Sequence, residues 1–128
     1  MRRLSVHKNH YLFAAIVWTL GIAVLCLISF RELPSIAIGG ADKYVHFILH
    51  FGYTLLWFLY FNQKNPIVKK ALLKAMLSSV GYGILIEIAQ GLFTATRKAD
   101  IYDVFANSSG TIGAAVVILT YFYYFKKR

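Results

Sequence analysis

The sequence predicts an all-α integral membrane protein, a four-helix bundle with both termini in the cytoplasm. Three observations support this fold class. Hydrophobic residues make up 59% of the chain and charged residues only 15%, against about 25% charged residues in soluble proteins. The apolar residues form four long runs, and most basic residues lie at alternate ends of these runs. With 128 residues, the chain is expected to form one transmembrane domain, residues 1–128.

Each of the four runs is close to the length of about 20 residues that crosses a bilayer as a helix. Residues 11–30 have no charged side chain, and this run is longer than the apolar part of a signal peptide, so we expect it to be retained. Residues 44–61 contain two histidines, residues 75–93 contain one charge, Glu87, and residues 104–125 contain no charge. The runs are continuous rather than alternating, which argues against membrane β-strands.

The distribution of charge predicts the orientation. Ten of the 14 basic residues, and no acid, lie at the N-terminus, between the second and third runs, and at the C-terminus. They are Arg2, Arg3, Lys8, Lys64, Lys69, Lys70, Lys74, Lys126, Lys127 and Arg128. The residues on the other side balance to zero. The positive-inside rule therefore places both termini in the cytoplasm, and the net charge of +9 indicates topology rather than nucleic-acid binding.

Small residues predict close helix packing in the third and fourth runs, because they let helix backbones approach each other in lipid. Pairs four positions apart are Ser79 and Gly83, Ala106 and Gly110, and Ser109 and Gly113. Asn65 and Pro66 mark the turn between the second and third runs.

Polar side chains recur at helical spacing near the outer ends of three runs. Asp42, His46 and His50 are four residues apart, so they share one helix face. Glu87 lies 13 residues beyond Lys74, about 20 Å along a helix. An ionised carboxylate at that depth is costly unless it is paired or hydrated, so Glu87 is expected to face the bundle interior.

The start of the fourth run has a similar stripe, in which Asp100, Asp103 and Asn107 are three and four residues apart. All three stripes lie at the same depth on the same side, which predicts one polar pocket open to the outside or to the outer leaflet. The candidate ligand-binding residues are Asp42, Lys43, His46, Glu87, Gln90, Arg97, Asp100, Asp103 and Asn107. The plainer alternatives are helix caps at the aspartates and structural hydrogen bonds at Glu87 and Asn107.

These residues also form an ordered set of motifs. The set is Asp42-Lys43-x-x-His46-Phe47, Glu87-x-x-Gln90 before Arg97, and Asp103-Val104-x-x-Asn107-x-x-Gly110-x-x-Gly113. It resembles the VanZ-like family from about residue 42 to residue 118. The resemblance implies a small multi-span protein of the bacterial cytoplasmic membrane. The namesake of the family is associated with teicoplanin resistance, but the resemblance implies no established reaction, and His50 departs from the family pattern.

Three functions follow as hypotheses. The first is binding of a cell-envelope lipid, a lipid-linked precursor or a lipoglycopeptide, with Lys43, His46 and Arg97 holding a phosphate or carboxylate. The second is an enzyme that hydrolyses or transfers a lipid-linked phosphate, with His46, Glu87 and Asp103 as catalytic residues. The third is a structural or regulatory membrane protein whose polar residues only hold the helices together.

The sequence gives little support for a metal and none for another cofactor. His46 and His50 are four residues apart and, with Glu87 and Asp103, form the candidate metal set. No established metal motif accompanies them, so no cofactor is expected. The expected partners are membrane lipids and not nucleic acid, and the sequence leaves the oligomeric state open.

Overall fold

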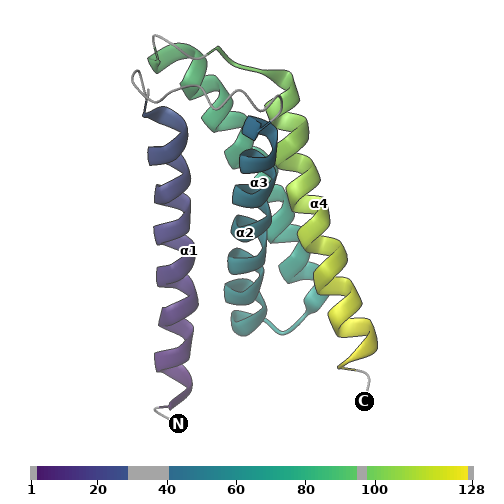
Figure 1. Ribbon diagram of the computed structural model, residues 1–128. Helices are drawn as coiled ribbons and strands as arrows, with labels where there is room; N and C mark the ends of the chain where they lie inside the picture. Colours follow the sequence, from purple (N-terminus) through teal and green to yellow (C-terminus); the bar gives the residue numbers. More distant parts are fainter. Residues whose placement is uncertain (1–2, 29–40, 95–97, 127–128) are drawn as a thin grey trace.

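The computed structural model describes residues 3–28, 41–94 and 98–126, with side chains from His10 onward. These residues form four helices, shown in Figure 1. They are α1 (Arg3–Leu27), α2 (Ala41–Lys64), α3 (Val68–Phe93) and α4 (Ile101–Tyr124). Each helix is long and apolar enough to cross a membrane, which confirms the predicted all-α architecture with four spans.

All four helices begin earlier than the apolar runs that predicted them. α1 begins eight residues before residue 11, α2 three before residue 44, α3 seven before residue 75, and α4 three before residue 104. Each added segment contains at least one charged residue, which interrupts the apolar pattern that predicts a span. Helix geometry itself tolerates these charged residues. The predicted end of the first span, at residue 30, lies outside the described residues.

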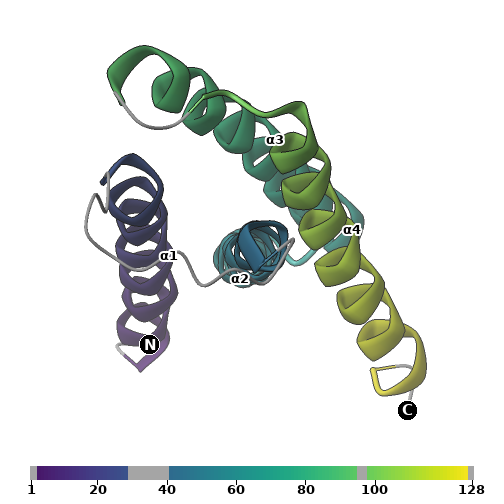
Figure 2. The ribbon, with the colours of Figure 1, turned by 45° about the horizontal axis from the view of Figure 1, so that its top comes forward.

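α2 is the central helix of the bundle. It packs against α1, α3 and α4, whereas α1 and α4 do not contact each other in the part of the chain that the structure describes. Figure 2 shows α2 between α1 on one side and the α3–α4 pair on the other. Figure 1 shows that α1 begins and α4 ends at the same end of the bundle. The opposite end therefore holds the start of α2, the end of α3 and the start of α4.

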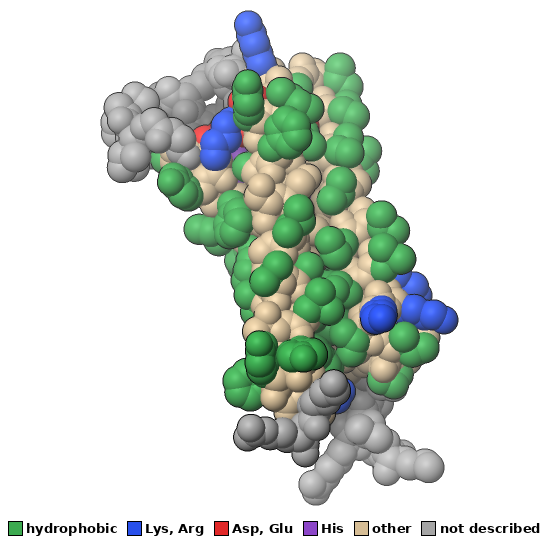
Figure 3. All heavy atoms as spheres, turned by 90° about the vertical axis from the view of Figure 1, so that its right-hand side faces the viewer, with side chains coloured by type: hydrophobic (Ala, Val, Ile, Leu, Met, Phe, Trp, Pro, Cys, Tyr) green, Lys and Arg blue, Asp and Glu red, His purple; other side chains and the backbone are tan. Residues whose placement is uncertain are grey.

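Inside the bundle, small and polar residues lie beside a smaller number of large apolar ones, whereas most of the large apolar residues are exposed. Ser79, Gly83 and Ala114 are buried between helices, whereas Leu92 and Phe93 are among many large apolar side chains that are exposed. Figure 3 shows hydrophobic side chains spread along one whole face of the molecule. This arrangement suits lipid, which solvates apolar side chains, while small residues let helix backbones approach.

α2 and α4 approach each other very closely at Gly110. A Cβ atom built on Gly110 would collide with the backbone carbonyl of Phe47, and one on Gly113 would come within 3.1 Å of the Phe47 ring. Only glycine fits at position 110, because the backbone of α2 occupies the space that a side chain would need. This contact confirms the predicted close packing at the small residues of the fourth run.

Residues in the connections determine where the neighbouring helices end and begin. Asn65 and Pro66 lie between α2 and α3, as predicted, and the Ile67 N–H donates to the Asn65 carbonyl (2.7 Å). Proline suits this turn because it has no N–H to donate. At the start of α4, the Asp100 carboxylate accepts from the Tyr102 N–H (2.8 Å), so Asp100 is the helix cap.

α1 is held to the bundle by side chains that donate to backbone carbonyls. The Trp18 indole N–H donates to the Leu49 carbonyl (2.9 Å), and the Tyr82 hydroxyl donates to the Thr19 carbonyl (2.6 Å). These bonds cross between helices, so they fix the position of α1 against α2 and α3.

We predict that Gly110→Ala destabilises the protein, because the new methyl group must push α2 away from α4. The expected cost is about 1–3 kcal/mol, as for other overpacked cores, measured as a lower midpoint of thermal unfolding in detergent. Gly81→Ala is the control, because nothing lies within 4 Å of a Cβ built there. Equal unfolding midpoints for Gly110→Ala and the wild type would contradict this account of the α2–α4 contact.

Candidate functional site

A cluster of charged and polar side chains lies at the end of the bundle that is far from the termini. α2 contributes Lys43 and His46, α3 contributes Glu87, and the start of α4 contributes Asp103 and Asn107. Acidic and histidine side chains are visible beside lysine near the top of Figure 3. Helical spacing aligns each group on its own helix, and the α2–α4 contact brings the groups together.

Lys43 joins the start of α2 to the start of α4. Its ammonium group donates to Asp100 Oδ2 (2.6 Å) and also to Asp103 Oδ1. Both acids of the α4 stripe are therefore already paired with this lysine. A phosphate or carboxylate ligand would have to compete with them for Lys43.

His46 lies at the centre of the cluster, and its side chain is only 3% exposed. Its Nδ1 atom is 3.0 Å from Asn107 Oδ1, and its Nε2 atom is 3.5 Å from Asp103 Oδ2. Nε2 is also 3.8 Å from Asp42 Oδ1, one helical turn earlier on α2. Oxygen atoms thus face both nitrogens of the ring.

Glu87 connects the cluster to α3. Its Oε2 atom accepts from the backbone N–H of Asp100 (3.1 Å), which places it level with the start of α4. Its Oε1 atom is buried, lies 4.0 Å from His46 Nδ1, and has no hydrogen-bond partner among the described residues. The structure confirms the prediction that Glu87 faces the interior, since the side chain is 4% exposed.

The cluster contains more acids than bases. Among the described residues that contact one another there, four are acidic, and only Lys43 and His46 offset them. The acidic residues are Asp42, Glu87, Asp100 and Asp103. Even with a protonated His46, this part of the site favours cations and hydrogen-bond donors over anions.

Two predicted residues contact groups outside this cluster. Gln90 is buried, but its amide donates to the Cys26 carbonyl of α1 (2.9 Å). His50 is buried one turn below His46, where its Nδ1 atom is 2.9 Å from Ser79 Oγ. Arg97 lies outside the described residues.

A chain of hydroxyl groups, which was not predicted from the sequence, continues from His50 into the middle of the bundle. Ser79 Oγ is 2.7 Å from Thr111 Oγ1, and the Thr54 hydroxyl lies 3.4 Å from the same atom. Thr54 follows His50 by four residues, and Thr111 follows Asn107 by four residues. This spacing extends both polar stripes, and it is the feature of the sequence from which the hydroxyl chain could have been predicted.

Two hollows flank the cluster. One, of about 320 Å³, lies between α3 and α4, and the other, of about 300 Å³, lies between α2 and α4. The first is lined by Ile84, Glu87, Ile88, Ala99, Asp100, Ile101 and Val104. Glu87 and Asp100 thus meet an otherwise apolar cavity, which is suited to a ligand with an apolar part.

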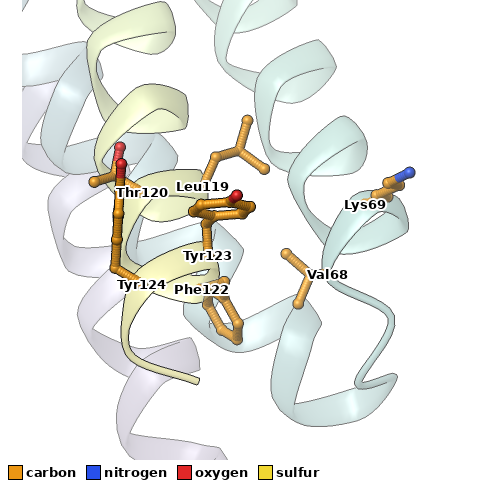
Figure 4. Close-up of a pocket in the computed structure, with 7 residues that line it drawn as sticks. All are labelled: Val68, Lys69, Leu119, Thr120, Phe122, Tyr123 and Tyr124. Atoms are coloured by element: carbon orange, nitrogen blue, oxygen red, sulfur yellow. The ribbon is translucent and has the colours of Figure 1, made fainter. Parts of the chain in front are cut away.

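A larger groove, of about 530 Å³, lies at the other end of the bundle between the start of α3 and the end of α4. Figure 4 shows its aromatic and aliphatic lining, which includes Val68, Leu119, Phe122 and Tyr123. It holds none of the predicted site residues, so cavity size does not identify the candidate site. The polar chemistry does.

The fold and the cluster together define a small multi-pass membrane protein with a buried polar site at one end. The family model described as VanZ/LLP1 matches residues 4–124. The chain belongs to the VanZ/LLP1 family, and the resemblance seen in its polar motifs is confirmed. No curated protein and no solved structure matches the chain.

We predict that Lys43→Met raises the pKa of Asp100. The Lys43 ammonium, together with the Tyr102 N–H, lowers this pKa below its ordinary value of 3.8 by stabilising the carboxylate. The ion pair therefore adds stability above pH 3.8, and this stability is lost as the pH falls through the lowered pKa. A carbon-13 NMR titration of the carboxyl group measures the shift. Lys69→Met, at the other end of the bundle, should leave the pKa of Asp100 unchanged, and an unchanged pKa in Lys43→Met would contradict the pairing.

Proposed function

We propose that this protein binds a lipid-linked, donor-rich group of the cell envelope, such as a peptidoglycan precursor or a lipoglycopeptide. The observation that supports this most directly is that two buried groups in the cluster have no hydrogen-bond partner among the described residues. They are the acceptor Glu87 Oε1 and the donor Asn107 Nδ2. Buried polar atoms are nearly always hydrogen-bonded, so an unpaired acceptor and donor in one cluster favour a ligand that offers both.

The chemistry of the cluster narrows the class of ligand. Sugar hydroxyls and peptide amides can donate to a carboxylate and can accept from an amide. A phosphate group only accepts, and the acidic excess of the described cluster disfavours it, so the sugar or peptide part of the ligand, and not a phosphate that links it to lipid, is expected to meet the cluster. The apolar hollow beside Glu87 is suited to part of a lipid chain. A glycopeptide or sugar attached to a lipid meets all three conditions.

An enzyme acting on the same class of ligand is the second candidate. It is favoured by the position of His46, which lies between Asn107 on one side and Asp103 on the other. A carboxylate and an amide can hold an imidazole in one orientation for proton transfer. In this candidate His46 acts as the base, and Glu87 or Asp103 acts as the acid.

We predict that a lipid-linked disaccharide-pentapeptide binds the protein in lipid nanodiscs more tightly than phosphatidylglycerol does. Glu87→Gln should weaken this binding by about tenfold or more, because a hydrogen bond to a charged group is lost. The glutamine keeps an oxygen that can accept from the Asp100 N–H, so the fold should survive. Native mass spectrometry measures the binding and also shows whether the bound precursor is recovered intact or cleaved.

Ser109→Ala is the control for this measurement, because the Ser109 hydroxyl is exposed and donates only to the carbonyl of Phe105 on its own helix. Cleavage that is lost in His46→Ala would favour the enzyme. Wild-type affinity in both Glu87→Gln and Asn107→Ala would leave only the structural role.

We also propose that both termini lie in the cytoplasm of a bacterial cell and that the polar cluster lies at the outer side. The basic residues near the termini and in the α2–α3 turn support this orientation through the positive-inside rule. The outer side is where lipid-linked precursors and lipoglycopeptides are found, so the orientation and the proposed ligand agree.

Cysteine labelling tests the orientation. In a Cys26→Ser background, the single cysteine of Lys98→Cys should react with a membrane-impermeant maleimide in intact spheroplasts. That of Asn65→Cys should react only after lysis. Both positions are exposed, so access to the reagent depends on the side of the membrane. The reverse pattern of labelling would contradict the proposed orientation.

A further inference from the structure

We propose that Asp42, His46 and Asp103 form a binding site for a divalent transition-metal ion. One ligand atom from each residue lies within 4.8 Å of the other two. His46 Nε2 is 3.8 Å from Asp42 Oδ1 and 3.5 Å from Asp103 Oδ2. Ligand atoms around a tetrahedral zinc ion lie about 3.4 Å apart, so a small contraction of the cluster would complete the site.

The hydrogen bond on the far side of the imidazole supports this inference. Asn107 Oδ1 can only accept, so His46 Nδ1 must carry the hydrogen that joins them at 3.0 Å. In the neutral ring, Nε2 then presents a lone pair to the carboxylates of Asp42 and Asp103. Three electron-rich atoms face one another there, and a cation between them would remove the repulsion. Metal-binding histidines commonly donate their second N–H to an oxygen in this way.

The carboxylate groups around the site stabilise a bound cation. Lys43 pairs with Asp103 Oδ1, which leaves Oδ2 directed at His46. Glu87 Oε1 is buried without a hydrogen-bond partner among the described residues, and it lies 4.0 Å from the Nδ1 atom of the same ring. A buried carboxylate oxygen without a donor is stabilised by a positive charge nearby.

The ligand types indicate the class of metal. Imidazole with carboxylates suits zinc, manganese, iron or cobalt better than magnesium or calcium, which prefer oxygen ligands alone. Three protein ligands leave a coordination position open for water or for a ligand group. The Asp42 side chain is 55% exposed, so an ion can reach the site from the end of the bundle.

This site differs from the candidate metal set that the sequence suggests. That set joined His46 to His50, but the His50 Nδ1 atom contacts Ser79 instead. The partner of His46 on α2 is Asp42, one turn in the other direction. The site shares Asp42, His46 and Asp103 with the proposed ligand-binding residues, but it requires no envelope ligand, so each proposal can fail separately.

Cobalt(II) is the probe, because its visible absorption reports both binding and geometry. The full-length protein, treated with a chelator and held in detergent without any lipid-linked precursor, should bind one cobalt ion per chain. Zinc should displace the cobalt. We expect Asp42→Asn to weaken cobalt binding by about tenfold or more and His46→Ala to abolish it. Asn107→Ala should weaken it by about tenfold, as expected for loss of a residue that orients a ligand.

His10→Ala is the matched control, because this histidine is exposed on α1 near the opposite end of the bundle. Asp42→Asn keeps the proposal testable if His46→Ala does not fold, since Asp42 is the exposed ligand and the amide keeps its shape. Absence of saturable cobalt binding by the folded wild type would overturn the proposal. So would wild-type cobalt affinity in Asp42→Asn.

Discussion

The close contact between α2 and α4 at Gly110 is the constraint on which the rest of the structure depends. The two helices run in the same direction along the bundle (Figure 1), so residue numbers rise together along both. Lys43 meets Asp103, His46 meets Asn107, and further along Thr54 meets Thr111. All of these are short side-chain contacts, which a larger residue at Gly110 would pull apart.

This contact matters more in lipid than it would in water. Lipid solvates apolar side chains as well as a neighbouring helix does, so burial of apolar surface contributes little to helix association. Close packing and hydrogen bonds between helices must supply the stability instead. In this bundle they come from glycine at the contact, from the hydroxyl chain of Ser79 and Thr111, and from side chains that hold α1 through backbone carbonyls.

The same contact concentrates charge in a way that the separate stripes do not reveal. Along the sequence, Lys43 is one of several cations available to an anionic ligand. In the bundle it is paired with Asp100 and Asp103, and the described cluster is left with an acidic excess. The separate stripes suggest an anionic ligand, whereas the acidic excess of the assembled cluster favours hydrogen-bond donors and cations. Both the proposed envelope ligand and the proposed metal ion depend on that acidic excess.

The sequence by itself determined the membrane class, the number of helices and the inward-facing stripes, because hydrophobic length and helical spacing are local properties. The sequence predicts that Glu87 faces the interior, and its side chain is buried there, as are those of His46 and Asn107. The turn at Asn65 and Pro66 was also predictable, because turn-forming residues are a local signal in the sequence.

Only the tertiary structure decided which stripe members meet. It turned Gln90 toward α1 and His50 toward Ser79, and it placed Asp42 beside His46 and Asp103. Helical spacing gives the face of a residue on its own helix. Partners on other helices depend on how closely and at what height the helices pack, and for α2 and α4 the backbone contact at Gly110 limits their separation.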